Sequence, residues 1–176
     1  MTNALVIGRD VPWNAAWTGE DRFELRPCRW ANGKLAVWQP TSPGNGKPMF
    51  ADPHMVRQRM SVMRMICTVC GQRTTPGDRW MFAMGEYIKH LGAKFWVTTE
   101  APVHKACAEL AGARCPHIRK LGIQPQPFPA GHMVMAALVG GEQFEKDFGI
   151  KVPAGQQIIG HLKIAFPATI IRERAA

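Results

Sequence analysis

The sequence predicts an α+β protein in which small antiparallel sheets and two main helices surround one cluster of cysteine and histidine residues. The first forty residues carry four of the six tryptophans among short segments that alternate as β-strands do. Two later segments, 53–66 and 102–114, each begin with a proline suited to the first turn of a helix. One Cys-x-x-Cys pair follows the first of these helices, and a His-x-x-Cys pair begins the second.

The strongest turn signal in the N-terminal region is Asn32-Gly33, because both central positions of a type I′ turn need positive φ. A two-residue turn here predicts a hairpin in which Trp30 lies opposite Leu35 and Cys28 lies opposite Val37. Cys28 is therefore interpreted as a core residue. The alternative is an extra metal ligand or a reactive thiol.

The segment 40–48 has the composition of a loop and lacks the G-x-x-x-x-G-K-S/T pattern of a phosphate-binding loop. Asp52 and Pro53 predict the start of a helix that runs to about Ile66. Arg57 and Arg64 are expected on its solvent face. The residues expected to face the core are Val56, Met60, Met63 and Cys67.

Further along the chain, 80–84 and 95–98 are predicted to form a second hairpin, and Pro116 ends the helix over 102–114. The last part contains an apolar stretch over 132–139, a short helix over 142–148 and an alternating strand around residues 162–166. We expect one compact unit with three regions: a β-rich region over 1–50, a zinc-binding core over 51–120 and an α/β extension over 121–176.

The two close pairs of cysteine and histidine predict a structural zinc site formed by Cys67, Cys70, His104 and Cys107. Structural zinc sites gather four soft or borderline ligands as two pairs from separated segments. The first pair lies in Cys67-Thr68-Val69-Cys70-Gly71, which has the form of a zinc knuckle with a glycine at the reversal. His104 and Cys107 lie one helical turn apart, so their side chains project in the same direction.

The order of knuckle, hairpin and ligand-bearing helix resembles the treble-clef family of zinc folds over roughly 66–115. The resemblance implies that Cys67 and Cys70 are the knuckle ligands and that His104 and Cys107 are the helix ligands. A histidine at the third ligand position departs from the all-cysteine pattern. The motif order also resembles uncharacterised small zinc proteins of bacteria and their phages, which suggests a phage or mobile-element origin.

Cys115 and His117 offer an alternative metal-binding pair. Eight helical residues separate Cys107 from Cys115, which places them about 12 Å apart at roughly 1.5 Å per residue. Both cannot bind one zinc ion, and His104 with Cys107 is the preferred pair. The choice between His104 and His117 as the histidine ligand stays open at this point. Otherwise Cys115 is a buried small hydrophobe and His117 a residue at a helix C-terminus.

The formal net charge of +9 favours a polyanionic partner, namely nucleic acid or a protein complex that handles nucleic acid. No acidic residue occurs between Pro53 and Gly77, so the helix over 53–66 is a candidate contact surface. A solvated cationic face is the simpler alternative. The candidate nucleic-acid-binding residues are Arg57, Arg59, Arg64, Arg73, Lys105, Arg114, Arg119 and Lys120.

The chain shows no export signal, because Arg9 and Asp10 interrupt the N-terminus before an apolar stretch has formed. Its longest apolar run, about 131–141, is too short to span a membrane. Five cysteines with a Cys-x-x-Cys pair then indicate metal binding rather than disulfides. We expect a cytoplasmic protein, in the host cytoplasm if a phage encodes it.

Three functional classes follow, with a zinc-stabilised binding or regulatory protein that contacts nucleic acid as the leading one. The first alternative is a structural or assembly protein of a phage particle, joined to a symmetric neighbour through its aromatic N-terminal region and apolar C-terminal strand. The second is a metal-dependent nuclease, because treble-clef folds include the His-Me nucleases. His90, His117 and His132 are the histidines available to it, but none has the paired context of such nucleases. Four protein ligands close a zinc site, so an enzyme is less expected and no catalytic residue is assigned.

Overall fold

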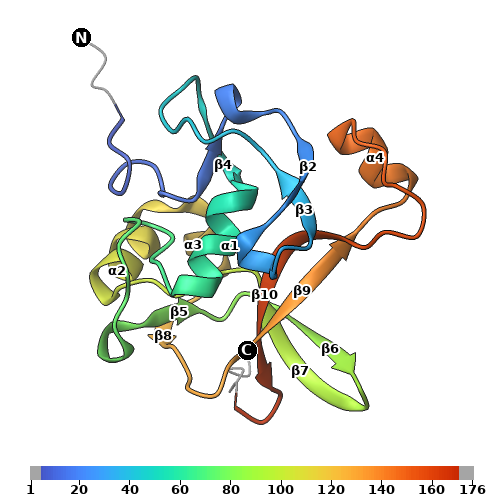
Figure 1. Cartoon of the computed structure of the whole chain (residues 1–176). Helices are drawn as coiled ribbons and strands as arrows, with labels where there is room; N and C mark the ends of the chain where they lie inside the picture. Colours follow the sequence, from blue (N-terminus) through green and yellow to red (C-terminus); the bar gives the residue numbers. More distant parts are fainter. Residues whose placement is uncertain (1–4, 171–176) are drawn as a thin grey trace.

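The computed structural model describes residues 5–170 and confirms a mixed α+β fold built around one long strand (Figure 1). That strand, β10 (Ile158–Pro167), pairs along one edge with β9 and along the other with β3 and then β7. The sheet order is β2-β3-β10-β7-β6, with β9 on the second edge of β10. The other strands of this sheet are β2 (Glu24–Pro27), β3 (Leu35–Trp38), β6 (Glu86–His90), β7 (Ala93–Thr98) and β9 (Met133–Val139).

Two small antiparallel sheets and four α-helices surround the central sheet. One small sheet pairs β1 (Ala15–Trp17) with β4 (Pro48–Pro53), and the other pairs β5 (Trp80–Phe82) with β8 (Pro125–Pro127). The helices are α1 (Met55–Arg64), α2 (Lys105–Arg114), α3 (Pro116–Leu121) and α4 (Glu142–Phe148). Three 3₁₀ turns complete the described elements: η1 (Thr18–Glu20), η2 (Arg29–Ala31) and η3 (Pro76–Asp78).

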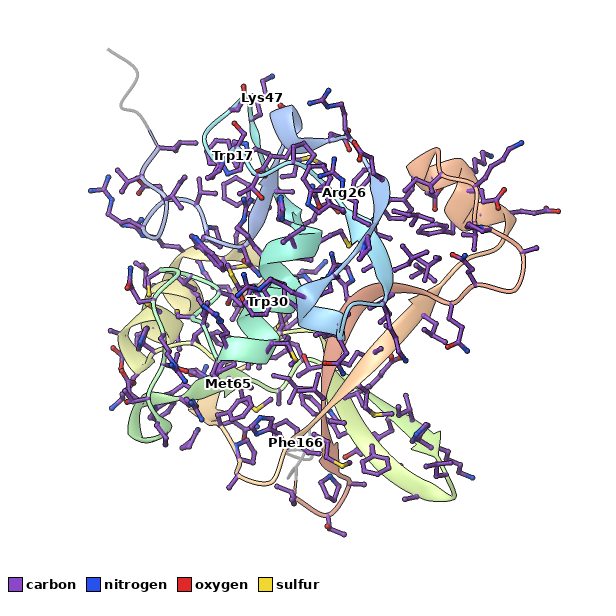
Figure 2. The ribbon with its side chains drawn as sticks, viewed as in Figure 1. Trp17, Arg26, Trp30, Lys47, Met65 and Phe166 are labelled. Atoms are coloured by element: carbon purple, nitrogen blue, oxygen red, sulfur yellow. The ribbon has the colours of Figure 1, made fainter. Side chains whose placement is uncertain are left out.

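The main core lies between α1 and the central sheet (Figure 1). Ile164 and Phe166 of β10 are fully buried, and Val62 of α1 lies in the same apolar cluster. Met65 belongs to this cluster, and Trp30 packs against it (Figure 2). Burial of an apolar side chain contributes roughly 1.5–3 kcal/mol, so this cluster supplies much of the stability of the fold.

Helix α1 begins at Met55, two residues later than predicted, and its N-cap is His54 rather than Asp52. The His54 Nδ1 atom accepts hydrogen bonds from the backbone N–H groups of Val56 and Arg57, and Nε2 lies 2.9 Å from the Pro40 carbonyl oxygen. Asp52 belongs to β4, whose pairing with β1 extends the chain up to the helix. The cap is therefore a neutral histidine with Nε2–H donating to Pro40.

The buried face of α1 differs from the prediction, which placed Arg57 and Arg59 on a contact surface. Arg57 is 3% exposed, and its guanidinium donates two hydrogen bonds of 2.8 Å to the fully buried Glu20 carboxylate. Met63, which was predicted to face the core, is 43% exposed. Removing one partner of a buried ion pair costs about 3–5 kcal/mol, so Arg57 has a structural role.

Arg59 and Gln58 connect α1 to the edge of β10. The Arg59 guanidinium is fully buried and donates to the carbonyl oxygens of Val37 and Gly160. The Gln58 amide donates to the Thr99 and Leu162 carbonyl oxygens, both at 2.7 Å, and accepts from the Leu162 N–H at 3.0 Å. Arg59 is therefore also removed from the candidate nucleic-acid-binding residues.

The N-terminal hairpin exists, but its predicted register is wrong. Asn32 and Gly33 do have positive φ, 53° and 75°, yet they lie in a seven-residue connection, 28–34, that also contains η2. The Cys28 N–H donates to the Lys34 carbonyl oxygen, and Leu25 rather than Cys28 lies opposite Val37. Cys28 is nevertheless a core residue, 9% exposed, as predicted.

The strand pairing predicted for 80–84 and 95–98 is also wrong. Strand β5 pairs with β8, while β7 pairs with β6 across a tight turn at residues 91–92. Helix α2 begins at Lys105, later than predicted, and ends at Arg114 as predicted, with Pro116 in the first turn of α3. The short helix and the alternating strand predicted near the C-terminus are confirmed as α4 and β10, and the apolar stretch, to which no secondary structure was assigned, contains β9. Within residues 5–170, no helix has the length and apolar character needed to cross a membrane.

We expect the free energy of unfolding to decrease as the pH falls from about 6.5 to about 4, because burial lowers the pKa of His54 from 6.5 to about 4. The unfolded chain binds this proton near pH 6.5 and the folded chain only near pH 4. The stability contributed by neutral His54 is therefore complete above pH 6.5 and is lost progressively as the pH falls from 6.5 to about 4. One such proton changes stability by about 1.4 kcal/mol per pH unit.

Urea unfolding at several pH values should show a smaller pH dependence for His54→Asn, which keeps a capping oxygen but does not titrate. Burial also lowers the pKa of His161 to about 4, so part of the slope remains in both proteins. Equal slopes for the variant and the wild-type protein would contradict this prediction.

Candidate metal centre

The first pair of predicted metal ligands lies in a tight turn just after α1. The Cys67 N–H donates to the Gln72 carbonyl oxygen at 2.8 Å, and the Gly71 N–H donates to the Cys67 carbonyl oxygen at 2.9 Å. Gly71 has a φ of 75°, a conformation that favours glycine. An antiparallel bridge between Ile66 and Arg73 closes the turn, so both thiols lie on a fixed reversal of the chain.

The second pair lies at the start of α2. His104 is the N-cap residue, and Cys107 is in the first turn of the helix. The Asp78 carboxylate accepts a hydrogen bond of 2.8 Å from the Lys105 N–H, which satisfies one of the free donors at this helix end. The partial positive charge at the helix N-terminus acts in favour of a Cys107 thiolate, against the effect of burial.

The fold brings these four side chains together as the sequence predicted. One donor atom from each of Cys67, Cys70, His104 and Cys107 lies within 4.8 Å of every other. The Cys70 Sγ atom is 3.4 Å from His104 Nδ1, so Nδ1 is the ring nitrogen that faces the first pair. Four donors at this spacing suit tetrahedral coordination, in which sulfur atoms at about 2.3 Å from a metal lie about 3.8 Å apart.

The other ring nitrogen of His104 contacts the backbone of Arg73, two residues after the knuckle. Nε2 lies 3.3 Å from the Arg73 carbonyl oxygen, so an N–H there donates to that oxygen and leaves Nδ1 free as a ligand. Histidine ligands in metalloproteins are commonly oriented in this way by a second hydrogen bond. The histidine of the four-donor group is therefore His104, and the Arg73 backbone orients its ring.

Burial raises the pKa of two thiols of the group, Cys67 and Cys107, and keeps them protonated when no cation is bound. Cys67 is fully buried, and burial raises the pKa of its thiol although backbone N–H groups of Cys70 and Val69 act in the opposite direction. Burial and the neighbouring Cys67 raise the pKa of Cys107. Binding of a divalent cation would therefore release protons from these thiols.

The alternative pair, Cys115 and His117, is not part of this group. Cys115 is half-buried at the junction of α2 and α3, and His117 is exposed in α3. Among the described residues, the four-donor group includes neither of them. His90 is exposed at the end of β6, and His132 packs against Phe128 with 5.4 Å between ring centroids.

The N-terminal segment covers the knuckle, a contact that no sequence signal indicated. The Trp13 N–H donates to the Val69 carbonyl oxygen at 2.8 Å, and the Asn14 N–H donates to that of Thr68 at 3.1 Å. The Trp13 ring lies so close to Gly71 that an added Cβ would be 2.6 Å from it. Trp13 thus packs against the turn that carries the first pair.

The remaining candidate nucleic-acid-binding residues are all exposed: Arg64, Arg73, Lys105, Arg114, Arg119 and Lys120. Arg114 pairs with Asp10 at 3.0 Å, and Lys105 Nζ lies 5.3 Å from the Trp80 ring centroid. Arg64 and Arg73 line one cavity of about 490 Å³ together with Met63, Ile66 and Gly71. This cavity lies directly beside the knuckle.

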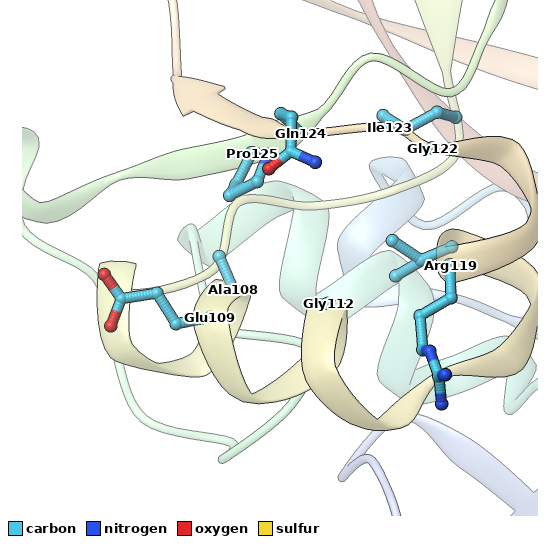
Figure 3. Close-up of a pocket in the computed structure, with 9 residues that line it drawn as sticks. Ala108, Glu109, Gly112, Arg119, Gly122, Ile123, Gln124 and Pro125 are labelled. Carbon is cyan, nitrogen blue, oxygen red and sulfur yellow. The ribbon is translucent and has the colours of Figure 1, made fainter.

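A second cavity, of about 460 Å³, lies between α2, α3 and the segment that leads into β8. Glu109 and Arg119 lie at opposite ends of it (Figure 3). Its lining includes no cysteine or histidine, and it is separate from the four-donor group.

Comparisons of this chain with known protein families, with curated proteins and with solved structures gave no match.

We expect Gly71→Ala to destabilise the protein and to weaken metal binding. An alanine in this left-handed conformation costs about 1–2 kcal/mol, and its Cβ would also clash with Trp13. Gly77→Ala is the matched control, because nothing lies within 4 Å of an added Cβ there.

The clash can be separated from the backbone strain by the double variant Trp13→Ala/Gly71→Ala. Its loss of unfolding free energy, measured with urea, should be smaller than the sum of the two single losses. Additive losses would show that Trp13 does not restrict this position.

Proposed function

We propose that the four-donor group binds one zinc ion with a structural role. Three thiolates and one imidazole suit zinc better than magnesium or calcium, which prefer oxygen ligands. Four protein ligands fill a tetrahedron and leave no position for a water molecule. The group thus suits a stabilising metal, and we assign it no catalytic role.

The treble-clef relation is part of this proposal, supported by the order of the elements. A knuckle, a hairpin and a ligand-bearing helix follow one another in the chain. The hairpin β6–β7 belongs to the central sheet, while the strand nearest the ligands is β5, which bridges to Val103 through Trp80. The site would therefore be a treble-clef-like centre whose hairpin has been extended into a larger sheet.

We expect purified protein to contain one zinc ion per chain, and Cys70→Ser to lose most of it. Elemental analysis measures the metal, and thermal unfolding with and without a chelator measures its contribution to stability. Cys115→Ser is the matched control and should keep its zinc. Loss of zinc in the control alone would instead support the pair Cys115 and His117.

The zinc centre supports one wall of a basic and aromatic surface, which we propose as the contact with single-stranded nucleic acid. We call it the Arg/Trp surface, formed by Arg29, Trp30, Arg64 and Arg73. The guanidinium carbons of Arg29 and Arg64 lie 4.3 Å and 4.6 Å from the Trp30 ring centroid. Arg64 and Arg73 face the cavity beside Gly71, and the Arg73 backbone orients the zinc ligand His104.

The observation that carries this proposal is the absence of acidic partners at this surface. Among the described residues, no ion pair involves any of its three arginines, and no carboxylate lines the cavity. Uncompensated guanidinium groups beside an aromatic ring can bind phosphates and stack on unpaired bases. Single strands are favoured over duplexes because stacking requires exposed base faces.

We expect Arg64→Ala/Arg73→Ala to weaken binding to labelled single-stranded DNA or RNA and to make it less dependent on salt. Each lost phosphate contact on a single strand should reduce the slope of log affinity against log salt by roughly 0.7. Titrations with single-stranded DNA, duplex DNA and RNA at increasing salt measure this.

Arg26→Ala is the matched control, because Arg26 is also an exposed arginine over a tryptophan, at 3.6 Å from the Trp38 ring centroid, but is paired with Glu24. The control should bind as the wild-type protein does. Absence of binding at low salt would contradict the nucleic-acid proposal and leave the zinc proposal unaffected.

A further inference from the structure

Strand β9 is an exposed edge of the central sheet with an unusual composition. In the described part of the chain, the sheet has three edge strands, β2, β6 and β9. Charged residues or proline on an edge strand hinder pairing with another chain. Strand β2 has the sequence ELRP and β6 has EYIKH, whereas β9 has MVMAALV, without a charged residue or proline.

The apolar face of the sheet also extends beyond the elements that cover it. Val134 lies opposite Ile164, and Leu138 lies opposite Ile159. Directly opposite residues share a face of the sheet, and these two isoleucines belong to the buried core beneath α1. Val134 and Leu138 are 40% and 54% exposed. On β9, the side of the sheet that faces the core is therefore not covered by other elements.

We propose that β9 pairs with β9 of a second copy of this chain, antiparallel and about a two-fold axis through Ala136. The central residue of β9 is Ala136, so this pairing places Val134 of one copy opposite Leu138 of the other. Both copies use the same surface, as a two-fold interface requires. The central sheet then continues across the dimer, and Val134 of each copy packs beside Leu138 of the other.

A second copy suits this edge because the strand is complementary to itself. Around Ala136, Val134 lies opposite Leu138 and Met133 opposite Val139, while Met135 lies opposite the smaller Ala137 and the alanines meet at the axis. The chain carries a net charge of +9, so most of its surface repels a second copy, but the pairing brings no charged β9 side chain into contact. Seven residues span about 24 Å, which is small for an interface and predicts micromolar association.

Sedimentation analysis over a series of protein concentrations tests the association. The wild-type protein should form dimers reversibly, and Leu138→Lys should weaken them about tenfold or more, because symmetry places the substitution twice in the interface. Leu91→Lys adds the same charge at a leucine that is 93% exposed outside β9, and it should dimerise as the wild-type protein does. Unchanged circular dichroism and metal content would show that both variants are folded.

Ala136→Cys tests the position of the axis. Paired residues in antiparallel strands lie at Cα distances of about 4.5–5.5 Å, within the range of a disulfide. Mild oxidation should therefore link two copies through the introduced thiol, as peptide mapping would show. A protein that is monomeric at every concentration would overturn the proposal and leave the edge to an extended segment of another protein. A dimer that survives Leu138→Lys would also overturn it.

Discussion

Arg59 and Gln58 hydrogen-bond to the edge of β10 where this strand changes its partner from β3 to β7. Strands β3 and β10 are joined by a single residue pair, Ile159 and Ala36, and pairing with β7 resumes at Ile164. The side chains of α1 take the place of a neighbouring strand over this gap. Backbone groups in a buried sheet need partners, so this polar contact allows one continuous sheet to form.

Helix α1, which makes this contact, also leads the chain to the first pair of candidate metal ligands. Helix α1 ends at Arg64, and Met65 adopts a left-handed conformation with a φ of 53°, which turns the chain into the knuckle. The Thr74 N–H and hydroxyl both donate to the Met65 carbonyl oxygen at 2.8 Å, and they hold the two ends of the knuckle together. A metal ion would link this point to the start of α2, which lies more than thirty residues further along the chain. Its contribution to stability is then that of a cross-link closing a long loop.

The sequence identified the four candidate ligands because their chemistry and spacing are local, and the structure brings these side chains together. It also located α4 and the alternating strand β10, whose apolar patterns are local. It misplaced the buried face of α1, because the partners of Arg57 and Arg59 lie 22 to 101 residues away and carry no local signal. The prediction of strand partners was wrong for the same reason, because β5 pairs with β8, a strand more than forty residues away.

The placement of arginines also changes how the positive charge should be interpreted. Arg57 is neutralised by Glu20, and Arg59 is solvated by backbone carbonyl groups inside the protein. Both contribute to the net charge without being available to a partner. Arg64 and Arg73 differ, because each is exposed and lines a cavity without a carboxylate. Since electrostatic attraction acts through accessible and uncompensated groups, these positions, rather than the net charge, support an anionic ligand. Their place beside the knuckle would also make the geometry of that surface depend on the metal.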